Sequence, residues 1–201
     1  MSEIVVQKFG GTSVGTVDRI DSVAEIIKNA SKSNKIVVVV SAMGGETNRL
    51  VDLAKAFGDD PDKREFDALV STGETVSSAL LTMALHSKGV KAKSFSASQI
   101  SMRTTSSYSK AKILDVDAKK ILDVVENDTI PIITGFQGVT EGGDVTTLGR
   151  GGSDTTAVAI AAQIAATRCD IFTDVDGIFT TDPGVVPNAK KLDSITMEEM
   201  L

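Results

Sequence analysis

The stretch VTTLGRGGSDTTAVAIAAQIAATRCDIFTD, residues 145–174, decides the fold class. It opens with a glycine-rich loop, continues into small and apolar residues from Ala157 to Ala166, and closes with an apolar strand from Cys169 to Thr173. A helix that is apolar on all sides has no face for solvent. We therefore expect residues 157–166 to form a helix that is buried deep inside an α/β domain.

The loop from Gly149 to Asp154 has the chemistry of an anion site. Glycines before a helix let backbone N–H groups approach an anion, and the helix N-terminus adds a partial positive charge. Arg150 can hold a carboxylate or phosphate with two parallel hydrogen bonds, and Asp154 adds an acceptor beside it. The alternative is a loop in which Ser153 or Asp154 only caps the helix. Capping does not require an arginine among glycines, so we favour the anion site.

The composition argues against several classes of function. A chain of 201 residues can form one sizeable α/β domain, and its net charge of −6 does not suit a nucleic-acid or acidic membrane surface. No apolar run approaches membrane-spanning length, and the N-terminus lacks the pattern of a signal peptide, so we expect a cytoplasmic location. The single histidine, His86, and the single cysteine, Cys169, argue against Ser–His–Asp, Cys–His and histidine-rich metal catalysis.

Strand and helix patterns alternate along the chain, which predicts a mainly parallel sheet with helices on both faces. The predicted strands are residues 4–9, 35–41, 90–95 and 130–134. The predicted helices are residues 17–30, 47–57, 65–87 with an interruption near 71–74, and 116–126. A Ser- and Thr-rich stretch, residues 100–114, predicts a hairpin or flap. Ligands bind beyond the carboxyl ends of parallel strands; the polar and glycine-rich segments that follow these ends are residues 8–11, 41–44, 135–138 and 173–177.

The first glycine loop fits no standard phosphate signature. Gly10 and Gly15 have the spacing of a P-loop, but Thr16-Val17 follows where Lys-Ser/Thr is required, and the dinucleotide pattern G-x-G-x-x-G also fails. What remains is Lys8 at a strand end before two glycines. A lysine there can meet a phosphoryl group while loop amides hold the other oxygens. A simple tight turn explains the same residues equally well.

Six segments together resemble the aspartate kinases of the amino-acid-kinase family, in the family's order and across essentially the whole chain. They are QKFGGTSVG (7–15), VVVVSAMG (37–44), STGETVSSALL (71–81), ITGFQG (133–138), TTLGRGGSDTTA (146–157) and CDIFTDVDGIFTTDP (169–183). The resemblance implies a three-layer α/β/α sandwich with an open, mainly parallel sheet. It also implies the reaction of ATP with L-aspartate to give 4-phospho-L-aspartate, the first step towards lysine, methionine and threonine.

The resemblance also implies roles for the residues that match. Lys8 would neutralise charge on the phosphoryl group, and Asp154 would orient Lys8. Glu74 would receive the substrate ammonium and Arg150 would hold its α-carboxylate. The full set for the amino-acid substrate is Ser41, Glu74, Arg150, Gly151, Gly152 and Ser153. The set for ATP is Lys8, Gly10, Gly11, Ser13, Thr173, Asp174, Phe179 and Asp182. Mg²⁺ would be held mainly by the nucleotide phosphates, so we expect no protein metal site.

The chain departs from the family pattern at two places. Asp182-Pro183-Gly184 stands where the family commonly has Asp-Pro-Arg, and residues 43–48 differ from the commoner Met-Gly-Lys/Asp-Thr-Thr. Both departures concern nucleotide affinity and turnover. We expect residues 1–201 to be a kinase catalytic domain that is truncated at its C-terminus and lacks the regulatory ACT domains, so that lysine, threonine and methionine exert no allosteric effect.

Two alternatives stay open. One is a kinase of the same fold that acts on glutamate, acetylglutamate, carbamate or UMP, although Glu74 with Arg150 favours a free amino acid over the last two. The other is a non-catalytic fragment that binds ligand without turnover. In each case the expected partners are small molecules, with no nucleic acid and no membrane, and a homodimer stays open.

Overall fold

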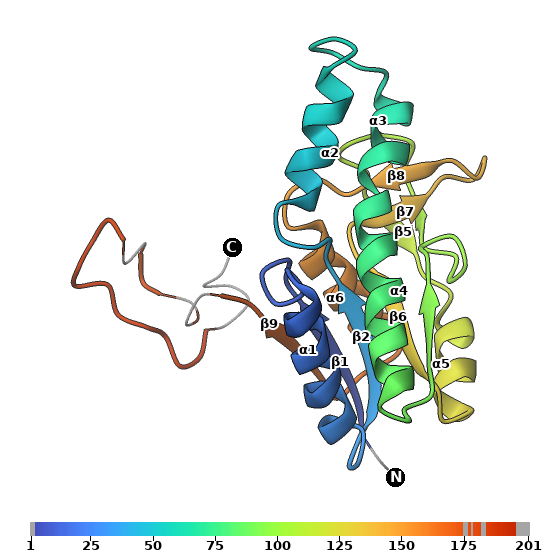
Figure 1. The fold of residues 1–201 in the computed structure, drawn as a ribbon, viewed down its shortest axis with the longest axis vertical. Coiled ribbons are helices and arrows are strands. Elements are labelled where there is room, and N and C mark those ends of the chain that lie inside the picture. The colour runs from blue at the N-terminus through green and yellow to red at the C-terminus, as the bar shows by residue number, and fades with distance from the viewer. Residues whose placement is uncertain (1–2, 175–176, 178, 182–183, 196–201) are drawn as a thin grey trace.

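Five parallel strands form the centre of the fold, and helices cover both of its faces (Figure 1). The computed structural model describes residues 3–174, 177, 179–181 and 184–195. The strand order is β3 (Ala92–Phe95), β6 (Ile130–Thr134), β2 (Lys35–Val40), β1 (Ile4–Phe9) and β9 (Arg168–Phe172). One face carries α1 (Val17–Ala30) and α4 (Thr72–Ser87); the other carries α5 (Ala118–Glu126) and α6 (Gly152–Gln163). The predicted three-layer α/β/α sandwich is confirmed.

The two sides of the sheet form two separate cores because successive residues of a strand point to opposite faces. In β2, Val38 and Val40 pack with α1 and α4, whereas Val37 and Val39 pack with α5 and α6. The uninterrupted valine run is therefore required by burial on both faces. The carboxyl ends of β1, β2, β6 and β9 all reach the same edge of the sheet, because the strands are parallel.

A second, smaller sheet lies beyond this edge, together with the helices α2 (Glu46–Lys55) and α3 (Lys63–Val70) (Figure 1). Its order is β5 (Ile113–Asp115), β4 (Arg103–Thr104), β7 (Gln137–Val139) and β8 (Val145–Thr147). The predicted hairpin within residues 100–114 is confirmed, because β4 and β5 pair in antiparallel fashion. The β7–β8 hairpin was not predicted. It needs Gly138, where an added Cβ would lie 2.1 Å from Cγ2 of Thr104.

The prediction for α6 is wrong in two respects. The helix begins at Gly152, five residues before the predicted start, so the glycine-rich segment is partly helical. Its burial is also one-sided: Thr156, Ala157 and Ile160 are buried, whereas Val158 is 53% exposed. The buried residues recur every three or four positions and face β1, β2 and β9. The outer side of the helix also carries small and apolar residues, so composition alone did not distinguish it from the buried side.

The predicted interruption of the long helix lies at Ser71, between α3 and α4, and Ser71 itself keeps helical dihedral angles. The combined stretch 63–87 contains an 18-residue apolar window with a mean hydropathy of 1.2, so by length and composition alone it could span a membrane, contrary to our expectation. It is the one such helix in the described part of the chain, and half of that apolar window is buried inside the fold. Because α4 packs on α1, β3 and β6, the apolar residues serve the protein core.

Candidate functional site

A pocket of about 450 Å³ lies at the carboxyl edge of the large sheet, between the first glycine loop and the start of α6. This volume is within the range of small-molecule sites, roughly 300–1,000 Å³. Ligands of open parallel sheets bind at this edge. Its lining comes from segments that follow β1, β2, β6 and β9, together with α4 and the loop before α6.

Lys8 and Asp154 form an ion pair in the pocket, with 2.7 Å between Nζ and Oδ1. Lys8 is near the end of β1 and is only 7% exposed, because the strand is covered on both faces. Asp154 lies in the first turn of α6, where the partial positive charge of the helix end favours a carboxylate. β1 and α6 thus fix the ammonium group of Lys8 and the carboxylate of Asp154 beside each other in the pocket.

Glu74 is a buried carboxyl group in the first turn of α4. Its Oε1 accepts a hydrogen bond from the backbone N–H of Ala42 at 3.0 Å. Its Oε2 is buried and has no hydrogen-bond partner among the described residues. Burial raises the pKa of Glu74 to about 7, against the opposing effect of the Ala42 hydrogen bond. A buried acceptor without a donor is uncommon, and it identifies a place where a ligand donor would be stabilised.

Ser77, one turn after Glu74, holds the segment that follows β2. Its hydroxyl donates to the carbonyl of Ser41 at 2.6 Å and also approaches the carbonyl of Glu74 at 3.1 Å. Together with the bond from Ala42 to Glu74, this ties residues 41–42 to the first turns of α4. Ser41 lies in the pocket lining as a result.

Close backbone approaches hold the glycine segments together. A Cβ at Gly11 would lie 2.9 Å from the carbonyl oxygen of Ala42, and a Cβ at Gly135 would lie 2.7 Å from the Ser153 side chain. Gly10 donates its N–H to the carbonyl of Phe172 at 3.1 Å. The segments that follow β1, β2, β6 and β9 therefore form one continuous wall.

The start of α6 is open to the pocket. Its N-cap residue is Gly151 in the left-handed conformation (φ 72°), and no side chain caps the helix. The capping alternative for Ser153 and Asp154 is therefore wrong, since both residues lie inside the first turn. Arg150 is exposed, lines the pocket, and makes no side-chain hydrogen bond or ion pair with any described residue. Its guanidinium can therefore engage a ligand without losing an internal partner.

The structure brings most of the predicted site residues into this pocket. Those in the lining are Lys8, Gly10, Gly11, Ser41, Glu74, Arg150, Gly151, Gly152, Ser153, Asp154, Thr173 and Asp174. Ser13 is not among them, because its amide closes the loop on the carbonyl of Gly10 at 2.9 Å. Phe179 is also outside the lining and forms an isolated antiparallel bridge with Lys191. Asp182 lies outside the described residues.

Some lining residues were assigned no individual role from the sequence, although Gly149 lies in the predicted anion loop. They are Thr12, Ala42, Met43, Gly44, Gly45, Thr47, Phe136 and Gly149. Most belong to the segments that follow predicted strands, so position at a strand end was the usable signal. Within the described residues, no three His, Cys, Asp or Glu side chains are grouped to hold a metal ion.

A strand-end lysine, paired glycine segments and an open helix N-terminus surround one pocket, and this arrangement in an α/β fold suits small anionic molecules. Residues 3–201 match the family model described as "Amino acid kinase family", and the chain belongs to this family. It is 55% identical over 199 residues to an aspartate kinase of Pseudomonas putida, covering 98% of this chain and 48% of that protein. The chain spans about half the length of the curated relatives it matches.

Many solved structures are similar to this chain, among them two aspartate kinases. Aspartokinase III of E. coli, in complex with aspartate and ADP, has a TM-score of 0.86 and 32% identity. The alignment covers 95% of this chain and 54% of that one. The aspartate kinase from Synechocystis has a TM-score of 0.78 and 46% identity, covering 92% of this chain and 31% of that one.

Proposed function

We propose that this chain is the catalytic domain of an aspartate kinase, which transfers a phosphoryl group from ATP to the side-chain carboxylate of L-aspartate. The product is 4-phospho-L-aspartate. The observation that carries the proposal is the buried, unpaired Oε2 of Glu74, in the same pocket as Arg150 and the Lys8–Asp154 pair. The high identity to named aspartate kinases supports the choice of substrate.

Glu74 and Arg150 suit the two charged groups of an amino acid. The ammonium group would donate to Oε2 of Glu74, which removes the cost of a buried acceptor without a partner. The α-carboxylate would take two parallel hydrogen bonds from the guanidinium of Arg150. Ser41 and the amides of residues 151–153 complete this part of the pocket. Carbamate and UMP lack the ammonium group and are disfavoured.

Lys8 would neutralise the negative charge that develops during transfer, and Asp154 would hold its ammonium group in place. No general base is needed, because a side-chain carboxylate with a pKa of about 3.9 is already ionised at neutral pH. Positioning and charge neutralisation can supply most of the rate acceleration of such a phosphoryl transfer. Gly10 and Gly11 would line the phosphate path, with Thr173 and Asp174 towards the nucleoside. Mg²⁺ would enter with the nucleotide phosphates, which supply most of its oxygen ligands.

The test is an assay of ADP release and hydroxamate formation with ATP, Mg²⁺ and a panel of L-aspartate, L-glutamate, N-acetylglutamate, carbamate and UMP. L-aspartate should be preferred, and turnover of a different member instead would contradict the proposal.

Arg150→Lys keeps the charge but loses the planar fork, so aspartate binding should weaken by roughly 1–3 kcal/mol.

Glu74→Gln adds a matched comparison between two acids. Succinate resembles aspartate but carries no ammonium group, so this variant should weaken aspartate binding more than succinate binding. Equal losses for both acids would remove Glu74 from the ammonium site.

A second candidate is a fragment that binds ligand without turnover. The position of Phe179 favours it, because this residue pairs with Lys191 and is absent from the pocket lining where it would border the nucleoside. Binding of L-aspartate by calorimetry without any ADP release would support this candidate. We extend the main proposal to a cytoplasmic location, which suits the unpaired Cys169, and leave a homodimer open.

A further inference from the structure

Asp67 is a fully buried carboxylate on α3 that the proposed reaction does not use. Four neutral donors surround it. Oδ2 accepts from the backbone N–H of Thr147 at 2.7 Å and of Ser109 at 2.8 Å. Oδ1 accepts from the hydroxyl groups of Thr147 at 2.9 Å and Ser109 at 3.0 Å. Every hydrogen bond joins α3 to a segment of the small sheet or its loops.

The partners of Asp67 lead directly to the Arg150 loop. Thr147 is the last residue of β8, three positions before Arg150. Ser109 reaches the same loop from the other side, since a Cβ at Gly149 would lie 3.2 Å from the Ser109 carbonyl oxygen. Ser109 adopts a left-handed conformation (φ 64°), which is costly for a residue with a side chain and has to be held by its surroundings.

The helical segment that carries Asp67 also carries Glu74, so Asp67 links Glu74 to the Arg150 loop. Asp67 and Glu74 lie on one helical run, since Ser71 between α3 and α4 keeps helical dihedral angles. Seven residues of helix place them about 10 Å apart along the axis. Gln137 adds a second internal connection, because its Nε2 donates to the carbonyl of Ser71 at 2.5 Å.

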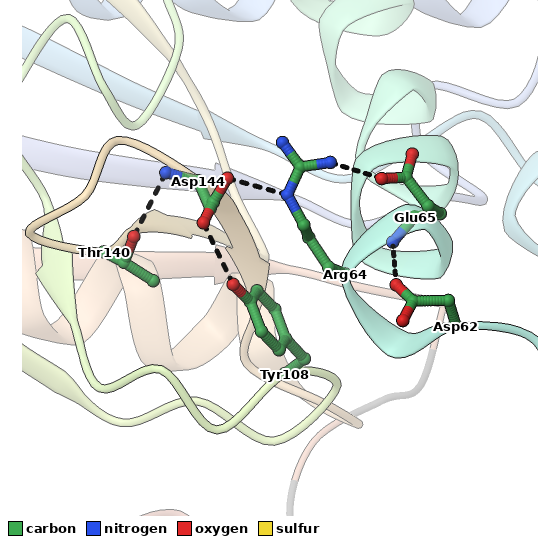
Figure 2. Close-up of polar contacts among 6 residues, drawn as sticks. All are labelled: Asp62, Arg64, Glu65, Tyr108, Thr140 and Asp144. Carbon is green, nitrogen blue, oxygen red and sulfur yellow. Dashed lines mark hydrogen bonds and ion pairs between the residues drawn. The ribbon is translucent and has the colours of Figure 1, made fainter.

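The same segments are tied again at the protein surface (Figure 2). Arg64 of α3 pairs with Oδ1 of Asp144 at 2.8 Å, and the hydroxyl of Tyr108 donates to Oδ2 of Asp144 at 3.1 Å. The backbone N–H of Asp144 also donates to Thr140 at 3.1 Å. The hydrogen bond from Arg64 lowers the pKa of Asp144, so this outer tie keeps its charge at neutral pH.

We propose that Asp67 is a positioning residue that sets the spacing between Glu74 and the Arg150 loop, and thereby the affinity for the amino-acid substrate. This inference rests on the proposed function of the two residues. A carboxylate with four donors has no freedom to shift without breaking a buried hydrogen bond. The ammonium and carboxylate groups of an amino acid have a fixed separation, so a loop that drifts relative to α4 would lose affinity for aspartate but not for ATP.

Thr147→Val tests the proposal because it keeps the shape of the side chain and removes one donor to Asp67. Thr146→Val is the matched control: Thr146 is equally buried on the same strand, but its hydroxyl contacts Thr104 at 2.6 Å and not Asp67. Thr147→Val should raise the Kd and KM for L-aspartate about 3–10-fold, the loss of one buried hydrogen bond, and leave those for ATP unchanged. Thr147→Ser should restore the affinity. Equal effects of the two valine variants, equal losses for ATP, or no rescue by serine would overturn the proposal.

Amide hydrogen exchange of residues 148–152 provides a readout that needs no turnover. Exchange should be faster in Thr147→Val than in Thr146→Val or the parent chain, because the loop before α6 has lost one of the four hydrogen bonds that anchor it to Asp67. Equal exchange in both variants would overturn the positioning role even if aspartate is the substrate. A parent chain that neither binds nor phosphorylates L-aspartate would contradict the proposed function, whereas the exchange result would still decide whether Asp67 holds the loop.

Discussion

Glu74 shows how a single residue can link burial, pH and ligand choice. The residue is 3% exposed, and its carboxyl group accepts a hydrogen bond from the N–H of Ala42. Its raised pKa results mainly from burial, which disfavours the charged form. A bound ammonium group would favour the charged form again. Binding of an amino acid near neutral pH should therefore release a proton from this residue.

The stability of the protein should depend on pH through Glu74. The ordinary pKa of a glutamate is 4.5, so below that pH the Glu74 carboxyl group is mainly protonated in the folded and in the unfolded protein. Between pH 4.5 and about pH 7 it is ionised mainly in the unfolded chain. The folded state therefore loses about 3 kcal/mol of stability from this group as the pH rises through that window. Urea unfolding of the parent and of Glu74→Gln at pH 4.5, 6 and 8 measures the difference. Parallel curves for the two proteins would contradict the raised pKa.

Lys8 is the residue whose loss should affect catalysis most directly. Because it should meet charge that develops during transfer, Lys8→Ala should lower kcat about 100-fold or more and leave aspartate binding nearly unchanged. Lys88→Ala is a suitable control, since Lys88 pairs with Asp21 and Glu25 outside the pocket. An unchanged kcat with a raised KM for aspartate would assign Lys8 to substrate binding.

At the scale of elements, Gly135 shows how one backbone position joins three segments. It follows β6, donates to the carbonyl of Val40 at 2.9 Å, and faces Ser153 at the start of α6. Its missing side chain allows the end of β2 and the first turn of α6 to meet. The geometry of the helix N-terminus in the pocket therefore depends on this glycine.

Gly135→Ala should destabilise the protein by about 1–3 kcal/mol, because the new Cβ would lie 2.7 Å from Ser153 and 2.9 Å from a backbone oxygen. Gly142→Ala provides the control, since its Cβ would meet only Oγ1 of Thr140, at 3.7 Å. This control should change stability by less than about 0.5 kcal/mol. The midpoints of urea unfolding compare the two. Equal midpoints would show that the start of α6 can shift freely.

Elements with a regular hydrophobic pattern could be predicted from the sequence. The predicted bounds of β1, α1 and β6 agree with the structure. The two strands are nearly continuous buried runs, and the buried residues of α1 recur at helical spacing. β7 and β8 have only three residues each, which is too short for a pattern. The start of α6 was missed because a Gly-Gly-Ser-Asp sequence is typical of a loop as well as of a helix start.

The pocket was predictable only in part. Strand ends meet at one edge in any parallel sheet, so Lys8, Ser41 and Thr173 could be grouped before the structure was known. Asp67 could not, because its partners Ser109 and Thr147 are 42 and 80 residues away along the chain. Such contacts depend on how the small sheet folds back over α3, which local sequence does not encode.

At the scale of the whole molecule, the large sheet has an open edge at β9 within the described part of the chain. Ile171 of this strand is 44% exposed, and Val158 on the adjacent helix α6 is 53% exposed. An exposed strand edge with apolar side chains favours pairing with another chain. The ion pair between Arg168 and Asp170 on the same strand adds charge but covers no apolar surface.

We therefore expect self-association that increases with concentration and involves β9. Ile171→Lys should weaken it, because a charge on an edge strand disfavours pairing. Met83→Lys is the control, as Met83 is 64% exposed on α4, which packs on β3 and β6 and not on β9. Sedimentation over a range of concentrations measures the effect. A parent chain that stays monomeric, or an equal effect of Met83→Lys, would place the contact elsewhere.

The ion pair between Lys8 and Asp154 gives the lysine an internal counter-ion before any ligand arrives. In the proposed reaction, a phosphate that approaches Lys8 would meet a cation that Asp154 already holds in place, and it would not have to strip water from a bare cation. The free-energy cost of removing water from Lys8 is then already included in the free energy of folding. Lys8 is nearly buried, but the Asp154 side chain is 48% exposed, so dissolved salt can screen the pair from that side. The pocket should therefore discriminate between anions by how well they fit beside this pair, and higher ionic strength should weaken their binding.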